Sequence, residues 1–243
     1  MFSHLILAGG RGVRMFGEVG GCKALIRVAS EHLIDYCVRE LPEPAVETRI
    51  LTSPEFEGSI TGWTRSHPGT NFEVVTQPAQ GTGAAVHELL KRSPEEVIVL
   101  TTCDIAGPPG ALRDFYIEAI LQARLARSRP FCGVATASVQ SEEDSPIYVH
   151  VNQDLQVTAY GKNAPVSPLT FASARVMNLA FAEALIANFW TGATDTEVMG
   201  QTLRMLPGSL QAIHASAVFD VDDQWALGRA RSLNKSPGSS IDK

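Results

Sequence analysis

A glycine-rich turn near the amino terminus constrains this chain more than any other feature of its sequence. Apolar residues at 5–7 predict a short buried strand, and the glycines Gly9, Gly10 and Gly12 follow it directly. Glycines in such a turn let backbone N–H groups converge on an anion. Cationic side chains close behind, Arg14 and Lys23 among them, add positive charge. The turn therefore predicts a polyphosphate-binding loop, which makes chemistry at a nucleotide phosphate the first hypothesis.

Two well-known phosphate-binding motifs do not fit these residues. A P-loop needs glycine immediately before Lys23 and serine or threonine immediately after it, but Cys22 and Ala24 stand there. The dinucleotide-binding fingerprint needs a small residue at position 15, which is Met15. A tight turn whose arginines face solvent stays open as a purely structural explanation.

Composition favours a single large α/β domain. The chain has 243 residues, of which 44% are hydrophobic and 19% charged, enough to bury a full core. The net charge is −6 and the longest cationic cluster is Lys91-Arg92, which argues against nucleic acid as a partner. Four separated cysteines without a C-x-x-C pair, and histidines without paired spacing, give no zinc site. With no signal-peptide pattern or long apolar run, we expect a cytoplasmic protein with reduced thiols, outside the membrane.

Strand and helix patterns alternate along the chain. Strands are expected at residues 49–52, 72–76 and 96–101, and helices at 33–41 behind Ser30 as N-cap, at 82–92 and after Pro108-Pro109. Four further strand patterns at 131–139, 147–151, 155–160 and 169–176 have few helical residues between them, which favours mixed pairing. Helices at 177–190 and 195–206, a strand at 212–219 and a short final helix complete the pattern. Thr194 and Glu197 form a capping box, so Asp195 and Glu197 are read as caps rather than catalysts.

The residues around the glycine turn resemble the Leu-Ala-Gly-Gly-x-Gly-x-Arg-Met signature of the nucleotidyltransferases that make nucleotide-sugars and related activated compounds, including sugar-phosphate nucleotidyltransferases and MobA-like NTP transferases. The segment 22–26 resembles the family's Pro-Lys-x-Leu segment with Cys22 in place of proline. Gln77 followed by Gly81-Thr82 resembles its base-reading segment, although Thr82 could simply be a helix N-cap. Most of residues 1–230 follow the family order.

This resemblance implies a Rossmann-like three-layer α/β/α fold with a mostly parallel mixed sheet and a smaller acceptor-side subregion. We expect one nucleotidyltransferase domain over residues 1–233 and a disordered tail over 234–243, which is rich in Ser, Lys, Gly and Pro. A monomer or a homodimer is expected.

Aspartates at the ends of two expected strands form the candidate metal site. Ligands of a parallel sheet collect at the carboxyl ends of its strands, where Asp104 and the pair Asp220 and Asp222 stand. The resemblance implies Mg²⁺ held by one Asp from each segment, with phosphate oxygens and water filling the other positions. As the ligand that joins Asp104, Asp220 is preferred and Asp222 is the next candidate. Asp223 is interpreted as a helix cap.

The resemblance also implies a role for each basic residue. Arg14 would bind the departing pyrophosphate, Lys23 the transferred phosphate, and Lys162 the acceptor phosphate, unless Lys162 is only a solvent-facing turn residue. The residues expected to hold the nucleotide are Leu7, Ala8, Gly9, Gly10, Arg11, Gly12, Gln77, Gly81 and Thr82. The acidic residue that relatives carry before this lysine is missing, and Ser173 stands where a later strand usually has glycine.

The implied activity is Mg²⁺-dependent transfer of NMP from a nucleoside triphosphate to a phosphorylated small-molecule acceptor, such as a sugar 1-phosphate, with release of pyrophosphate. Three alternatives stay open: a molybdenum cofactor guanylyl- or cytidylyltransferase, an alditol- or choline-phosphate cytidylyltransferase, and a non-catalytic nucleotide sensor. Activity screening with different acceptors would identify the first, and thermal protection by CTP alone would favour the second. Absence of turnover would indicate the third.

Overall fold

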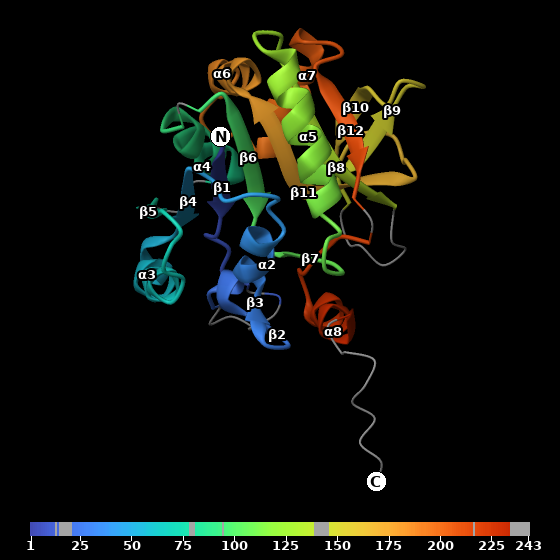
Figure 1. Ribbon diagram of the computed structural model, residues 1–243. Coiled ribbons are helices and arrows are strands. Elements are labelled where there is room, and N and C mark those ends of the chain that lie inside the picture. The colour runs from blue at the N-terminus through green and yellow to red at the C-terminus, as the bar shows by residue number, and fades with distance from the viewer. Residues whose placement is uncertain are drawn as a thin grey trace.

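A nine-stranded mixed sheet forms the centre of the computed structural model, which describes residues 1–12, 14, 21–77, 81–93, 95–138, 146–215 and 217–233 (Figure 1). The strand order is β10-β9-β11-β6-β1-β4-β5, with β8 paired to β11 and β12 paired to β8. The strands are β1 (Ser3–Leu7), β4 (Glu47–Thr52), β5 (Phe72–Thr76), β6 (Val97–Thr102), β8 (Cys132–Ser138), β9 (Tyr148–Val151), β10 (Val157–Gly161), β11 (Leu169–Asn178) and β12 (Leu210–His214).

Helices cover both faces of this sheet, which confirms the three-layer α/β/α prediction (Figure 1). The helices α2 (Leu33–Arg39), α3 (Glu57–Arg65) and α5 (Arg113–Ala126) contribute to one apolar cluster. The helices α4 (Thr82–Lys91), α6 (Leu179–Ala187) and α7 (Asp195–Met205) contribute to the other. Neighbouring residues of β1 alternate between the faces, Ile6 in the first cluster and Leu5 in the second, because side chains alternate along a strand.

Parallel and antiparallel pairing divide the sheet as the sequence predicts. The strand β1 lies parallel to β4 and β6, and β4 lies parallel to β5. The strand β11 is antiparallel to β6, β8 and β9. Its pairing with β8 is irregular between Phe171 and Arg175, where Ser173 adopts φ +51°. Ser173 therefore takes the left-handed conformation that usually favours glycine.

The expected strand over 212–219 is wrong, because the chain forms two separate strands there. The strand β12 ends at His214, and the positive φ of Ala217, +55°, redirects the chain away from β8. Residues Phe219–Asp220 then form β13, which pairs antiparallel with β7 (Ile105–Ala106). Asp220 thus lies within a short strand beyond the main sheet, next to the segment that follows Asp104.

The expected N-cap at Ser30 is also wrong. A turn containing Ala29, at φ +56°, joins β2 (Arg27–Val28) to β3 (Glu31–His32), so Ser30 lies before the second strand. His32 instead caps α2 in a capping box with Asp35. Helix α5 begins at Arg113, a few residues after the expected start at Pro108-Pro109.

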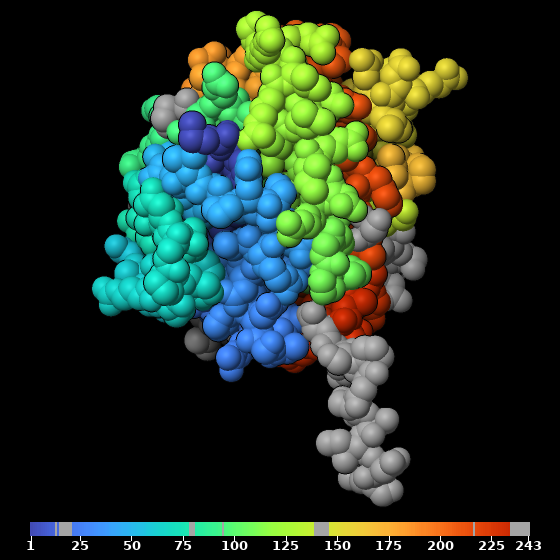
Figure 2. Space-filling model, viewed as in Figure 1, coloured from blue at the N-terminus to red at the C-terminus, as the bar shows by residue number. Residues whose placement is uncertain are grey.

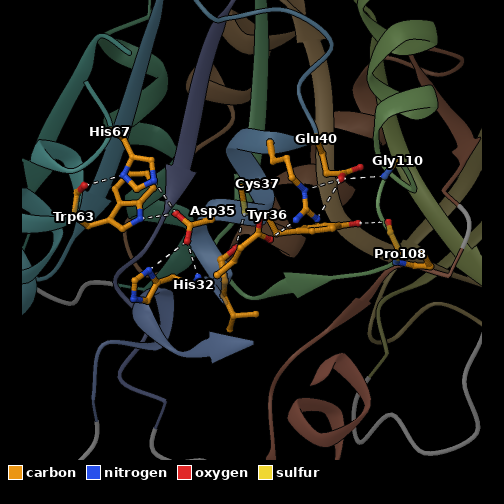
Figure 3. Close-up of polar contacts among 12 residues, drawn as sticks. His32, Asp35, Tyr36, Cys37, Glu40, Trp63, His67, Pro108 and Gly110 are labelled. Carbon is orange, nitrogen blue, oxygen red and sulfur yellow. Dashed lines mark hydrogen bonds and ion pairs between the residues drawn. The ribbon is translucent and has the colours of Figure 1, made fainter. Parts of the chain in front are cut away.

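Polar contacts fix α2 against its surroundings (Figure 3). Asp35 accepts a hydrogen bond from Trp63 Nε1 at 2.7 Å and pairs with His32 and His67. Glu40, 2% exposed, accepts from the backbone N–H of Gly110 at 3.1 Å. Helix α2 therefore holds the segment that leads from β7 into α5.

The surface shows the same arrangement: α2 and the segment after it lie beside α5 (Figure 2). Glu43 pairs with Arg124 of α5 at 2.9 Å. Helix α8 (Gln224–Leu233) packs with β2 in a third apolar cluster. Among the described residues, the four cysteines are free thiols and none of the helices has the length and apolar character needed to cross a bilayer. The expected tail at 234–243, like Met15, lies outside the described residues.

Candidate functional site

A cavity of about 270 Å³ opens at the carboxyl ends of the parallel strands. It is lined by Leu7, Gly9, Gly10, Lys23, Leu51, Ser53, Gln77, Gly81, Thr82, Ala85, Thr102, Cys103 and Asp104. The glycine turn, the residues Gln77, Gly81 and Thr82, and Asp104 after the end of β6 are far apart in the sequence but share this cavity. Parallel pairing of β4, β1 and β6 accounts for this convergence, since it aligns their carboxyl ends.

The glycine turn closes on the segment that carries Lys23. Gly21 donates its backbone N–H to the Arg11 carbonyl at 2.7 Å, and Gly12 adopts φ +55°. A Cβ on Gly10 would lie 3.7 Å from Lys23 Cδ, so the turn and this side chain are in direct contact. Ala8 is fully buried and donates its N–H to Leu51, which ties the turn to β4.

Arg11 makes a contact away from the cavity lining. Its guanidinium Nε lies 3.1 Å from Glu55 Oε1, and both side chains are largely exposed. The structure therefore pairs Arg11 with a surface carboxylate just before α3 and leaves the lysine of the 22–26 segment as the cation that lines the cavity.

Lys23 lies between two carboxylates. Its Nζ is 2.6 Å from Asp104 Oδ2 and also contacts Asp222 Oδ1, while its side chain is only 8% exposed. Burial lowers the pKa of Lys23, but the charges of Asp104 and Asp222 outweigh it and hold the pKa above its ordinary value. The amine is therefore a fixed positive charge at neutral pH.

Arg14 completes a cluster of four charges. Its Nη2 lies 3.0 Å from Asp222 Oδ2. Burial raises the pKa of Asp222, whereas Lys23 and Arg14 lower it to a net value below its ordinary one. We call Arg14, Lys23, Asp104 and Asp222 the charge cluster. It joins the glycine turn to the ends of two distant segments.

Asp220 lies beside this cluster in β13. It is the Cα partner of Ile105, and Val221 donates its N–H to the Asp104 carbonyl at 2.6 Å. The two candidate metal segments are thus adjacent in space, as the sequence predicts, but Asp222 is the member that contacts Lys23.

The carboxylates suit a divalent cation shared with a triphosphate. Asp104 Oδ1 is buried and has no hydrogen-bond partner within the described part of the chain. In those same residues no group of three or more His, Cys, Asp or Glu side chains could hold a metal by itself. Two carboxylates match the small share of protein ligands that nucleotide-bound Mg²⁺ uses.

Gln77 and Thr82 also line the cavity. Gln77 Oε1 is buried without a hydrogen-bond partner in the described residues, which leaves an acceptor for a ligand. The N-cap interpretation of Thr82 is wrong, because Gly81, at φ +89°, is the N-cap and Thr82 is the first residue of α4. The Thr82 hydroxyl instead accepts from the Asp195 backbone N–H at 3.4 Å.

Lys162 lies outside this cavity, in the turn after β10. It lines a wider groove of about 1420 Å³ that runs between this turn and α7 and includes Trp190 and Arg204. Thr82 lines both the groove and the cavity, so the two spaces adjoin. Gly161, directly before Lys162, has φ +138°, and a Cβ there would lie 3.4 Å from Thr196 Cγ2.

The sequence reasoning missed a buried ion pair. Arg175 of β11, 2% exposed, lies 2.6 Å from Asp195 Oδ2. Thr194 and Glu197 do form the expected capping box, but the Asp195 carboxylate accepts a hydrogen bond from Arg175 Nη2. Asp223 caps α8 as expected, accepting from Ala226 N at 2.7 Å. The available signal was a single arginine inside the otherwise uncharged strand 169–178.

Comparisons with known proteins bear on the family and the fold of the chain. The family model of the MobA-like NTP transferase domain matches residues 4–175. Among curated proteins, none matches the chain. A solved structure assigned as a glucose-1-phosphate thymidylyltransferase from Bacillus anthracis, in complex with a sucrose, superposes with a TM-score of 0.80 at 18% identity, covering 96% of this chain and 95% of that one.

Two further solved structures share the fold. The inositol-1-phosphate CTP transferase from T. maritima has a TM-score of 0.76 at 15% identity, with 95% and 94% of the two chains covered. A CMP:2-keto-3-deoxy-manno-octonic acid synthetase complexed with CTP has a TM-score of 0.69 at 13% identity, with 96% and 97% covered. At such identities these likenesses bear on the fold alone.

Proposed function

Because the chain belongs to the MobA-like NTP transferase family, we propose that it transfers a nucleoside monophosphate from a nucleoside triphosphate to a phosphorylated small-molecule acceptor. A sugar 1-phosphate, or a similar hydroxyl-rich phosphate, is the acceptor class proposed. The products are a nucleoside-diphosphate-activated compound and pyrophosphate.

The observation that carries the proposal is the position of the Lys23 ammonium. It lies between Asp104 and Asp222, in contact with the glycine turn, at the wall of a cavity large enough for part of a nucleotide. Two cations and two carboxylates beside a glycine turn suit a polyphosphate that is bound together with a divalent ion. A turn that served only the fold would not need this buried charge.

The proposed reaction joins two anions. An oxygen of the acceptor phosphate attacks the α-phosphorus of the triphosphate, the new P–O bond forms, and the bond to the bridging β-phosphate oxygen breaks with its electrons leaving on pyrophosphate. The attacking group is already an oxyanion, so no side chain needs to remove a proton. The protein must position the two anions and neutralise charge that builds in the transition state.

Each residue of the charge cluster has a part in this scheme. Lys23 neutralises the transferred phosphate, and Arg14, whose guanidinium offers a planar fork, binds the departing pyrophosphate. Asp104 and Asp222, with Asp220 adjacent, would hold Mg²⁺. When bound, that ion would supply positive charge to the reacting phosphates. The glycine turn would cradle the β- and γ-phosphates, with Gln77 and Thr82 at the base.

The acceptor is assigned to the groove that carries Lys162. The groove adjoins the cavity at Thr82 and presents Lys162 and Arg204 to an anion. The names of two fold relatives, a glucose-1-phosphate thymidylyltransferase and an inositol-1-phosphate CTP transferase, refer to acceptors with a phosphate on a hydroxyl-bearing ring. This supports the acceptor class and leaves the base and the particular compound to experiment.

Pyrophosphate release tests the proposal. The protein would be incubated with Mg²⁺, each of the four common triphosphates, and a panel of phosphorylated sugars, polyols, choline phosphate and pterins. We expect release that depends on both substrates and falls about 10²-fold or more in Lys23→Ala, as when an oxyanion donor is lost. The exposed Lys91→Ala, at the end of α4, is the matched control.

The panel also distinguishes the alternatives. Activity with a pterin acceptor would indicate a molybdenum cofactor nucleotidyltransferase. Activity with choline phosphate or an alditol phosphate and CTP would indicate a cytidylyltransferase. Nucleotide binding without pyrophosphate release from any pair would contradict the proposal and favour a nucleotide sensor.

A further inference from the structure

The buried guanidinium of Arg175 has an unusual environment. In β11 it stands opposite Leu100 of β6 and Val134 of β8, inside the central sheet. Its Nη2 binds Asp195, whereas its Nε and Nη1 have no hydrogen-bond partner among the described residues. The guanidinium carbon also lies 6.0 Å from the centre of the Phe171 ring. A buried charge with one ion-pair partner still costs free energy, and an apolar side chain would often pack there at least as favourably. This cost suggests a role besides packing.

Asp195 connects Arg175 to the nucleotide cavity. It is the first residue of α7, and its carboxylate lies 2.6 Å from Arg175 while its backbone N–H donates to the Thr82 hydroxyl at 3.4 Å. Thr82 is the first residue of α4 and lines both the cavity and the acceptor groove. One residue therefore joins the sheet interior to the cavity wall.

The two helix starts are also packed without free space. A Cβ on Gly83 would lie 2.2 Å from the Ala193 carbonyl oxygen, so the first turn of α4 lies directly on the backbone that leads into α7. This contact and the hydrogen bond between Asp195 and Thr82 join the two helix starts directly. The position of the cavity wall follows from where Arg175 holds the start of α7.

We propose that Arg175 and Asp195 are positioning residues for nucleotide binding. They act through Thr82, because they hold its hydroxyl and the first turn of α4 in place at the cavity. Neither Arg175 nor Asp195 contacts a substrate. The inference rests on the proposed function, because it assigns the nucleotide to this cavity. A purely structural ion pair would stabilise the fold but leave nucleotide affinity unchanged.

The test combines affinity, kinetics and a double-mutant cycle. Asp195→Asn keeps the shape of the side chain but removes its charge, and Arg175→Met removes the partner. Binding of the preferred triphosphate with Mg²⁺ would be measured by calorimetry, turnover by pyrophosphate release, and stability by thermal unfolding. The control, Arg49→Met, removes a largely buried arginine of β4 that lies 2.5 Å from Glu73 of β5 and 3.2 Å from Ser93, which follows the end of α4 opposite to Thr82.

We expect Asp195→Asn and Arg175→Met each to raise the nucleotide Kd and KM about tenfold with kcat within about threefold, while Arg49→Met lowers Tm and leaves Kd within about twofold. Thr82→Val should weaken binding in the wild type but add no further loss in Asp195→Asn, because Asp195 acts through the Thr82 hydroxyl.

Three results would overturn the inference: unchanged Kd in both variants, an equal change in Arg49→Met, or additive effects of Thr82→Val and Asp195→Asn. Each of these leaves the proposed function standing, because the wild type still binds nucleotide and turns over. If the wild type binds no triphosphate, the proposed function itself fails, and the inference fails with it.

Discussion

Lys23 Nζ lies 2.6 Å from Asp104 Oδ2 although 81 positions separate the two residues in the sequence. The contact connects the glycine turn after β1 to the carboxyl end of β6, and Asp222 joins it from the far end of the chain. Lys23 therefore neutralises both carboxylates, and a metal ion that binds the same oxygens must compete with it.

Removal of the Asp104 carboxylate should abolish most turnover and leave the fold intact. In Asp104→Asn, we expect pyrophosphate release to fall about 10²-fold or more, because one ligand of the proposed metal site and one partner of Lys23 are lost. Asp154→Asn, in an exposed turn before β10, is the control. An Asp104→Asn rate within threefold of the wild type would remove Asp104 from the metal site.

Lys23 should compete with divalent cations in the absence of nucleotide. The ammonium neutralises Asp104 and Asp222, so a cation that binds there alone must displace it. In Lys23→Gln, we expect Mn²⁺ without nucleotide to bind at least about threefold more tightly than in the wild type, measured by electron paramagnetic resonance. Equal or weaker Mn²⁺ binding would show that the lysine does not occupy a cation site.

Asp222 should contribute to stability only above acidic pH. The net effect of burial, Lys23 and Arg14 is to lower the pKa of Asp222 below 3.8, its ordinary value. A carboxyl whose folded pKa is lowered stabilises the fold above its unfolded pKa and loses that contribution as the pH falls through its folded pKa. We expect the Tm difference between wild type and Asp222→Asn to be largest near pH 7 and to shrink below about pH 4. A difference that grows with acid would contradict this.

His4 should make the fold sensitive to acid over a higher pH range than Asp222 does. Burial lowers the pKa of His4 from 6.5 to about 3, and its Nε2 lies 3.1 Å from the Thr101 hydroxyl. The unfolded chain therefore binds a proton that the folded chain does not, so stability falls as the pH drops from 6.5 towards 3. In His4→Gln, thermal scans across this range should show a weaker pH dependence, whereas the exposed His214→Gln should behave as the wild type.

Gln77 should act on the choice of base. Its buried Oε1 lacks a hydrogen-bond partner in the described residues and faces the cavity that it lines. We expect Gln77→Ala to change the relative kcat/KM values of the four triphosphates by about tenfold while the preferred acceptor stays the same, in a competition assay. Identical preferences in variant and wild type would exclude Gln77 from base recognition.

Most of the fold could be predicted from the sequence because its strands carry strong local patterns. The expected strand at 72–76 matches β5, and the apolar run at 96–101 matches β6 to within one residue. The strand β6 is buried on both faces of the sheet, so its apolar composition identifies it, whereas the edge strand β5, in which only Val75 is buried, is recognised by its β-branched residues. The expected strand at 212–219 failed because the pairing of β12 with β8 ends at His214, although apolar residues follow, and Ala217 has a positive φ.

The convergence at the site could be predicted only in outline. The carboxyl-end rule brings Asp104 and the glycine turn together, and β13 brings Asp220 and Asp222 beside them. Lys23 binds both carboxylates, and Arg11 pairs with Glu55. Both contacts depend on side-chain geometry, which cannot be read from the spacing of residues in the sequence. Arg175 was missed because its partner Asp195 lies on another element and looks like a helix cap.

A crystal structure with a triphosphate and Mn²⁺ tests the central claim most directly, since the anomalous signal locates the metal. The account predicts a Mn²⁺ peak on Asp104 and on Asp222 or Asp220, with the phosphates along the glycine turn and the Lys23 ammonium moved onto the phosphate. Phosphates bound away from that turn, or a metal held by other residues, would contradict it.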